Sequence, residues 1–312
     1  MTVPRLTLVI PCYNEEQALP ITMRRVDELL TGLIADGRIA PESRAVYVDD
    51  GSRDRTWTLI EQAAGGRIGG IKLAGNRGHQ HALLAGLLNV EGDVIVSMDA
   101  DLQDDLGAVA LMLEHYRQGA QIVYGVRSTR RADSAFKRIT AEGYYRVLKW
   151  LGVDIVFNHA DYRLMSRAAI EALRGYGEVN LFLRGIIPQL GFKTAQVEYE
   201  RAERVAGESK YPLGKMLALA WQGLTSFSPM PLRWITIFGS IVSVLSFLIG
   251  LWALVVRLSG NGHAIPGWAS TVIPMYFLGG IQLLSLGIIG EYIAKIYLET
   301  KRRPRFIIEK QL

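Results

Sequence analysis

Two aspartates and a glutamine alternate in the segment D-A-D-L-Q at residues 99–103. In an extended chain alternate side chains point to the same side, so these three polar groups can converge on one point. Two carboxylates this close repel each other unless a cation neutralises them, and hard oxygen ligands suit Mg²⁺ or Mn²⁺ held together with substrate phosphates. Because exposed loops also produce a D-x-D pattern by chance, its meaning depends on the elements around it.

Acidic residues also follow two short apolar runs nearer the N-terminus. The segment P-C-Y-N-E-E occupies residues 11–16, and D-D-G-S occupies residues 49–52. An aromatic ring can stack on a nucleotide base, and a carboxylate can accept hydrogen bonds from base or ribose. Taken alone, each segment is as compatible with a simple turn followed by a helix N-cap as it is with a nucleotide site. Neither a G-x-G-x-x-G fingerprint nor a P-loop motif follows the first run.

The elements that must position these segments are short strands alternating with helices. Apolar runs at residues 6–10, 45–48, 71–73 and 94–98 indicate buried strands, and helical periodicity covers residues 16–35, 54–64 and 79–88. This alternation predicts a doubly wound α/β fold with a mostly parallel sheet. Ligands of such sheets bind beyond the carboxyl ends of the strands. The acidic segments lie there, which favours a metal–diphosphate site over a solvated turn.

Beyond residue 106 the order is less regular. We expect a helix to about residue 118, a strand at 121–124 and a basic, aromatic helical stretch at 134–151. That stretch fits interfacial binding and packing on the sheet equally well. Residues 211–227 also predict an amphipathic helix, here at a membrane interface because an apolar stretch follows it directly.

Two charge-free apolar stretches, Trp234–Val256 and Trp268–Gly290, are long enough to cross a bilayer. The 312-residue chain has a formal net charge of +5, and its basic residues crowd before and after these stretches. This clustering indicates a membrane surface rather than nucleic acid as the anionic partner. The positive-inside rule predicts cytoplasmic termini and an external connection. No secretory signal is visible, so the soluble part is expected in the cytoplasm.

The chain contains a single cysteine, Cys12. One cysteine excludes an internal disulfide and fits a reducing compartment. Its place beside an acidic motif suggests a nucleophile, but no His–Asn or His–Asp partnership is indicated. We therefore interpret it as a small buried residue.

Several motifs occur together and in a fixed order: V-I-P-C-Y-N-E-E, V-D-D-G-S, N-R-G-H-Q-H-A-L-L-A-G-L, M-D-A-D-L-Q-D and Y-G-V-R. In this combination the chain resembles family 2 glycosyltransferases of GT-A fold. The segments D-Y-R-L-M-S, V-N-L-F-L-R-G and E-R-V-A-G-E-S-K-Y-P-L, with the two apolar stretches, make it similar to bacterial polyprenyl-phosphate glycosyltransferases of the bactoprenol type. It is more distantly similar to dolichol-phosphate mannose synthase. The resemblance covers essentially the whole chain.

This resemblance implies roles for individual residues. It assigns recognition of the nucleotide and donor phosphates to Pro11, Tyr13, Glu15, Val48, Asp50, Asp99, Ala100 and Arg127. It assigns binding of the metal and diphosphate to Asp99, Asp101 and Gln103, and catalysis to Asp101 and Asp161. Asp161 would take a proton, orient the donor sugar or stabilise developing positive charge. Binding of the acceptor phosphate is assigned to Arg204, Ser209 and Lys210. The alternative for these residues is general attraction to anionic lipid. For Arg77, His79 and His81 a helix-terminal surface position is favoured, and shaping of the donor pocket is the alternative.

The activity implied is metal-dependent, inverting transfer of a sugar to undecaprenyl or another polyprenyl phosphate for cell-envelope glycosylation. The donor would be UDP-glucose or UDP-N-acetylglucosamine, with an aminoarabinose-type sugar as a further candidate, and the site would face the cytoplasm at a bacterial membrane. The predicted organisation is a GT-A domain at 1–199, an interfacial segment at 200–231, two membrane helices at 232–292 and a basic cytoplasmic tail at 293–312, in a homo-oligomer such as a tetramer. Two alternatives stay open. A processive polysaccharide synthase shares the nucleotide motifs, although its Q-x-x-R-W motif does not occur here, and a non-catalytic nucleotide-sugar-binding membrane protein would share them too.

Overall fold

The computed structural model describes residues 3–127, 159–179, 181–200, 230–258 and 267–312. These residues divide into two compact units, one containing an α/β sheet and the other containing two long helices. The helical stretches predicted at 134–151 and 211–227 lie outside the described residues.

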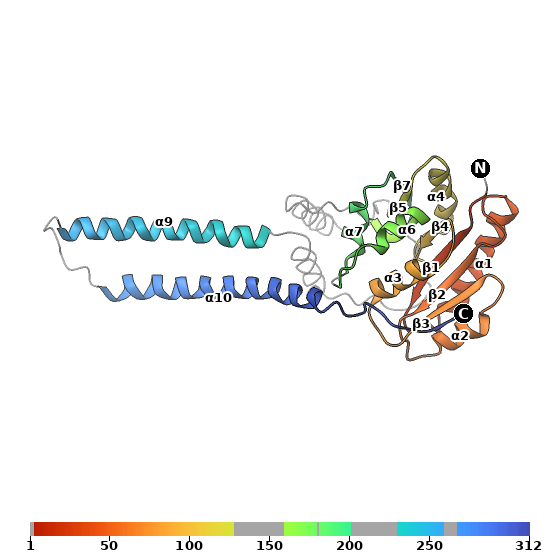
Figure 1. Cartoon of the computed structure of the whole chain (residues 1–312), viewed down its shortest axis with the longest axis horizontal. Helices are drawn as coiled ribbons and strands as arrows, with labels where there is room; N and C mark the ends of the chain where they lie inside the picture. The colour runs from red at the N-terminus through yellow and green to blue at the C-terminus, as the bar shows by residue number, and fades with distance from the viewer. Residues whose placement is uncertain (1–2, 128–158, 180, 201–229, 259–266) are drawn as a thin grey trace. The chain divides into compact units, whose positions relative to one another are not determined.

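Within the described residues, the α/β unit is built on one eight-stranded sheet (Figure 1). Its strands are β1 (Leu6–Cys12), β2 (Arg44–Asp49), β3 (Ile68–Leu73), β4 (Val94–Ser97), β5 (Ile122–Arg127), β6 (His159–Ser166), β7 (Thr194–Tyr199) and β8 (Ile308–Gln311). Its helices are α1 (Leu19–Ala35), α2 (Thr56–Ala63), α3 (His79–Asn89), α4 (Ala108–Arg117), α6 (Arg167–Arg174) and α7 (Leu183–Gln189). The strand order is β7-β5-β6-β4-β1-β2-β3-β8, and only β6 and β8 of these strands run against their neighbours. The predicted mostly parallel α/β fold is confirmed.

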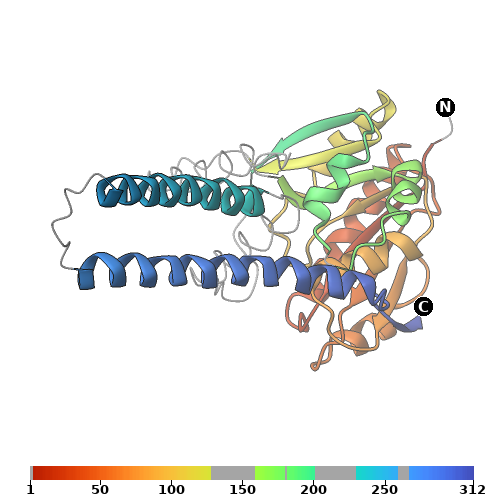
Figure 2. The ribbon, with the colours of Figure 1, turned by 60° about the vertical axis from the view of Figure 1, so that its left-hand side comes forward.

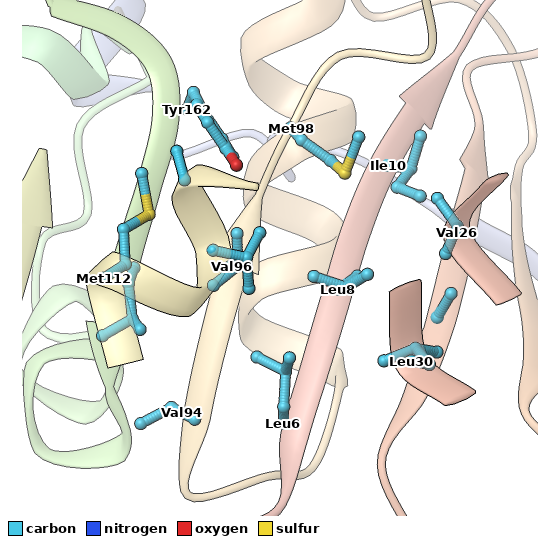
Figure 3. Packing of buried hydrophobic residues seen from close by; sticks show 14 of the residues in the cluster. Leu6, Leu8, Ile10, Val26, Leu30, Val94, Val96, Met98, Met112 and Tyr162 are labelled. Atoms are coloured by element: carbon cyan, nitrogen blue, oxygen red, sulfur yellow. The ribbon is translucent and has the colours of Figure 1, made fainter. Parts of the chain in front are cut away.

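An apolar layer joins the middle of this sheet to α1 and α4 (Figure 3). Every residue of β1 is buried, as expected for a central strand covered on both faces. Alternate residues of β1 and β4 point into the layer, where side chains of the two helices meet them. The layer includes Leu6, Leu8, Ile10, Val26, Leu30, Val94, Val96, Met98 and Met112.

The opposite face of the sheet is covered by α3, whose Gly86 lies directly against β1 and β2. A Cβ at Gly86 would lie 2.3 Å from Cγ1 of Val9 and 2.9 Å from Cγ2 of Val48. Those distances are shorter than van der Waals contact, so no side chain fits there without moving the helix or the strands. The absence of a side chain at Gly86 therefore sets how closely α3 packs on the sheet.

We expect Gly86→Ala to lower the free energy of unfolding by about 1–3 kcal/mol, because the added methyl group overpacks this contact. Gly32→Ala is the matched control. Gly32 lies in the interior of α1, and among the described residues no heavy atom lies within 4 Å of its added Cβ. This second change should raise stability by about 0.5–1 kcal/mol. Denaturant unfolding of the full chain in detergent measures both, and equal effects of the two substitutions would contradict the packing argument.

The strand β8 follows the last helix of the chain and joins the edge of the sheet. It pairs antiparallel with β3, and Leu312 donates its main-chain N–H to the carbonyl of Gly70 at 2.8 Å. Lys72 forms an ion pair with Glu309 at 2.8 Å, which adds a side-chain contact across the two strands. Part of the segment predicted as a basic tail is thus a strand of the α/β sheet.

The second unit contains α9 (Met230–Leu258) and α10 (Gly267–Thr300), which run alongside each other in Figures 1 and 2. The most apolar windows are Leu232–Ile249, with a mean hydropathy of 1.9, and Phe277–Thr300, with a mean hydropathy of 1.5. Among the described residues, neither window contains a buried position. Both predicted spans lie within these helices, which by length and composition are candidate membrane spans.

Candidate active site

The predicted donor residues gather at one edge of the sheet. Because β1, β2, β4 and β5 all run in the same direction, their carboxyl ends lie together, where ligands of such sheets bind. Tyr13 and Glu15 follow β1, Asp50 follows β2, and Asp99 and Asp101 follow β4. Arg127 is the last residue of β5. The structure therefore places the predicted nucleotide and metal residues in one region.

Asp50 holds the turn that leads into α3. Its carboxylate accepts the main-chain N–H groups of Arg77 and Gly78 at 2.7 and 2.9 Å, and the residue is only 2% exposed. Gly78 has a φ of +91°, a backbone conformation that glycine adopts without steric penalty. Asp50 thus stabilises the loop between β3 and α3, and its contact with a nucleotide stays a prediction.

The other predicted nucleotide residues differ in accessibility. Pro11 and Val48 are paired across β1 and β2, and both are buried. Tyr13 is 41% exposed, so its ring is accessible for stacking. Glu15 donates its main-chain N–H to the hydroxyl of Thr56 at 2.8 Å, which ties the turn after β1 to the start of α2.

The D-A-D-L-Q segment begins at Asp99, shortly after β4 ends at Ser97. The carbonyl of Ala100 accepts the hydroxyl of Thr22 at 2.7 Å, and Oδ1 of Asp101 accepts the main-chain N–H of Gln103 at 3.2 Å. Gln103 is buried, whereas the side chain of Asp99 is 34% exposed. Desolvation by burial raises the pKa of the Asp99 carboxyl to about 6. The segment is therefore fixed through its main chain while its first carboxylate faces a partly open region.

This donor set fits a hard divalent cation. In the part of the chain that the structure describes, no three His, Cys, Asp or Glu side chains form a ready metal cluster. Mg²⁺ is commonly held by only one or two carboxylates together with substrate phosphates, and Asp99 and Asp101 offer such a pair. A cation would also offset the desolvation that disfavours the charged form of Asp99. A metal site completed by the donor phosphates agrees with these residues.

Asp161 lies opposite this segment because β6 runs antiparallel to β4. Ser97 pairs with Arg163 in that register, and continuing it by two residues places Asp161 across from Asp99. Nε2 of His79, the first residue of α3, lies 3.5 Å from Oδ1 of Asp99 and 3.6 Å from Oδ2 of Asp161. The side chain of His79 thus contacts both the predicted metal segment and the predicted catalytic aspartate.

Two arginines bind the carboxylate of Asp161. Arg163 donates to Oδ1, and Arg184 donates from Nε to Oδ1 at 3.3 Å and from Nη2 to Oδ2 at 3.1 Å. Burial alone would raise the pKa of the Asp161 carboxyl. The neighbouring His79 ring and the charges of both arginines outweigh that effect and hold the pKa well below its usual range. Asp161 is consequently an ionised group whose oxygens are already occupied by donors.

Sequence reasoning favoured a surface position for His79 over a role in the donor pocket, and it assigned no role to Arg163 or Arg184. His79 is indeed helix-terminal, with 43% of its side chain exposed, yet it contacts both carboxylates. Arg163 carried a usable signal, because residues two apart in a strand share a face and it follows Asp161 by two. Arg184 belongs to the segment V-N-L-F-L-R-G that contributed to the family resemblance, but nothing in that segment indicated its contact with Asp161, which depends on the packing of α7.

Arg127, at the end of β5, is held by two residues from other elements. Its Nε donates to the hydroxyl oxygen of Tyr199 at 3.3 Å, and its Nη2 lies 3.5 Å from Oδ1 of Asp104. The predicted acceptor-phosphate residues Arg204, Ser209 and Lys210 lie outside the described residues. Their role stays a prediction.

The chain matches one family model over part of its length and several known proteins over nearly all of it. The model of glycosyl transferase family 2 matches residues 7–174. The uncharacterized glycosyltransferase YkoT of Bacillus subtilis (strain 168) is 48% identical over 313 residues, covering 99% of this chain and 92% of the relative. The prophage bactoprenol glucosyl transferase homolog of Escherichia coli (strain K12) is 38% identical over 312 residues, covering 98% and 99% of the two chains. The mannosyltransferase PcManGT from Pyrobaculum calidifontis, solved with GDP-Man and Mn²⁺, aligns with a TM-score of 0.47 at 17% identity, covering 95% of this chain and 85% of that one.

Proposed function

Since this chain belongs to glycosyl transferase family 2, we propose that it transfers a sugar from a nucleotide-sugar to a polyprenyl phosphate at a bacterial membrane. The observation that carries the proposal is the meeting of the D-x-D segment with ionised Asp161 at the carboxyl edge of the sheet. The two candidate membrane spans of the same chain support a lipid acceptor. Similarity over 98% of the chain to a relative named for bactoprenol glucosyl transfer supports the same class of acceptor.

The proposed donor is UDP-glucose, with UDP-N-acetylglucosamine as the second candidate. Glucose takes precedence because the E. coli relative is named as a glucosyl transferase homolog. The exposed ring of Tyr13 would stack on the base. Asp99 and Asp101 would hold Mg²⁺ or Mn²⁺, which when bound neutralises charge on the departing diphosphate.

The proposed chemistry is a single displacement. A phosphate oxygen of the acceptor forms a bond to the anomeric carbon, while the bond from that carbon to the diphosphate oxygen breaks, with inversion. A phosphate monoester has a second pKa of roughly 6, so the attacking oxygen is largely deprotonated without a base. Asp161, with its pKa held low and its oxygens occupied, is therefore assigned to stabilising positive charge on the sugar and to orientation rather than to proton removal.

The acceptor phosphate is proposed to meet Arg204, Ser209 and Lys210, which precede the first candidate span in the sequence. A phosphate on a long lipid stays near the headgroup plane, and cationic side chains close to that plane can form charge-assisted hydrogen bonds with it. In cells the acceptor would be undecaprenyl phosphate presented from the cytoplasmic leaflet.

The test is release of nucleoside diphosphate by the purified full chain in detergent. We expect UDP release from UDP-glucose only when a short-chain polyprenyl phosphate and a divalent cation are both added, with one sugar on each product lipid. Polyprenol without the phosphate is the matched control and should give no release. Products carrying several sugars would favour a processive synthase. Absence of release with every UDP- and GDP-sugar tested would favour a non-catalytic binding protein.

A further inference from the structure

The loop that follows the D-A-D-L-Q segment is held by two tyrosines from β6 and β7. Tyr162 donates its hydroxyl to the main-chain carbonyl of Asp105 at 2.8 Å, and Tyr199 donates its hydroxyl to the carboxylate of Asp104. The two rings meet edge to face, with centroids 5.3 Å apart and an interplanar angle of 88°. Both tyrosines are buried, so their hydroxyls are directed by packing as well as by hydrogen bonding. Consecutive residues of the loop are thereby fixed from the neighbouring strands.

Arg127 joins the same cluster from β5. It lies beside Tyr199 in the β5–β7 register, donates from Nε to the tyrosine oxygen at 3.3 Å, and places Nη2 3.5 Å from Oδ1 of Asp104. The side chain of Asp104 is only 3% exposed, compared with 28% for Arg127. A buried carboxylate thus anchors a guanidinium that is partly open to solvent.

The pKa of Tyr199 agrees with its role as a hydrogen-bond donor to Asp104. Burial raises the pKa of Tyr199, and the charge of Asp104 raises it further. Tyr199 therefore keeps its proton near neutral pH and serves as the donor to Asp104. In turn its oxygen accepts from Arg127, so one hydroxyl links the anion to the cation.

We propose that Asp104 and Tyr199 are positioning residues that hold Arg127 beside the D-A-D-L-Q segment, so that a diphosphate meets the cation site and the guanidinium in one arrangement. The inference rests on the proposed function, in which Arg127 contacts the donor phosphates. An arginine side chain has many rotamers, and restricting it before the ligand binds removes an ordering penalty from binding and from the transition state. Asp104 lies three residues after Asp101, so one loop positions both the cation site and the guanidinium of Arg127 that would contact the diphosphate.

The decisive variant is Tyr199→Phe, which removes one hydroxyl and keeps the ring that packs on Tyr162. We expect the KM for UDP-glucose to rise about tenfold, because a hydrogen bond to a charged group is lost. The KM for polyprenyl phosphate should stay within about twofold. Titration calorimetry with UDP and Mn²⁺ should show a matching rise in Kd, a readout that does not depend on turnover. Tyr47→Phe is the matched control, because Tyr47 is buried in β2 and its hydroxyl has no hydrogen-bond partner within the described part of the chain.

A second variant, Asp104→Asn, keeps an oxygen that accepts from Tyr199 but removes the charge opposite Arg127. The proposal expects it to weaken UDP–Mn²⁺ binding as well, about tenfold. If both variants lower the melting temperature while the Kd for UDP–Mn²⁺ equals that of Tyr47→Phe, the cluster is only structural and the proposal is overturned. It is also overturned if the wild type binds neither UDP nor GDP with Mn²⁺. A wild type that binds UDP but never transfers sugar to polyprenyl phosphate would instead contradict the proposed function and leave the binding comparison valid.

Discussion

Asp101→Asn should reduce turnover by about a thousandfold while the protein stays folded. Charge stabilisation by a bound metal ion contributes several kcal/mol to a transition state, and ~4 kcal/mol corresponds to about three factors of ten in rate. Asparagine can still accept the N–H of Gln103, so the main chain of the segment should keep its conformation. Initial rates of UDP release, with circular dichroism as the check on folding, measure the effect.

The same prediction has a chemical counterpart in the unmodified protein. Chelation with EDTA should abolish UDP release, and either Mg²⁺ or Mn²⁺ in excess should restore it. Asp36→Asn is the control for loss of an aspartate charge, because Asp36 is an exposed residue at the C-cap of α1. Full activity of Asp101→Asn, or of the wild type in EDTA, would show that the D-x-D segment does not hold a required cation.

Asp161→Asn should lower both stability and turnover. The side chains of Asp161 and Arg163 are 9% and 1% exposed, so the substitution leaves a buried guanidinium without its counter-ion. Breaking a buried ion pair in this way costs about 3–5 kcal/mol of stability. Loss of a preorganised charge at the reacting centre should also reduce turnover by about a hundred- to a thousandfold.

A double variant separates these two effects. Adding Arg163→Met to Asp161→Asn removes the unpaired buried charge, and replacing a buried ion pair by less polar groups is often nearly neutral for stability. We therefore expect the double variant to recover most of the lost free energy of unfolding but none of the lost turnover. Recovery of turnover together with stability would mean that Asp161 acts only through the fold.

The donor side of the site could be predicted because its residues follow buried parallel strands directly. Apolar runs of four or five residues located β1, β2 and β4 to within two residues at each end, and strand direction then fixed where the acidic segments meet. The family resemblance was carried by the same segments, and family membership is confirmed. Local sequence and sheet topology therefore agreed at these positions.

The strands β6 and β8 could not be predicted in the same way. β6 buries Asp161 and Arg163, and isolated charges in a sequence argue against a buried strand unless their mutual pairing is known. β8 is short and polar, and its partner Ile71 is separated from Gln311 by most of the chain. Arg184 likewise approaches Asp161 across 23 residues. These contacts depend on tertiary packing, which leaves no periodic signal in the sequence.

The pairing of β8 with β3 constrains the proposed membrane topology. Strands that share backbone hydrogen bonds lie in the same aqueous compartment, so a topology in which α9 and α10 are membrane spans must place the segments before α9 and after α10 on one side of the membrane. Two crossings satisfy this parity and a single crossing does not, whatever the distribution of basic residues. The order of synthesis follows as well. Because residues 308–311 leave the ribosome only after both helices, the edge of β3 stays without this partner until α9 and α10 have been made.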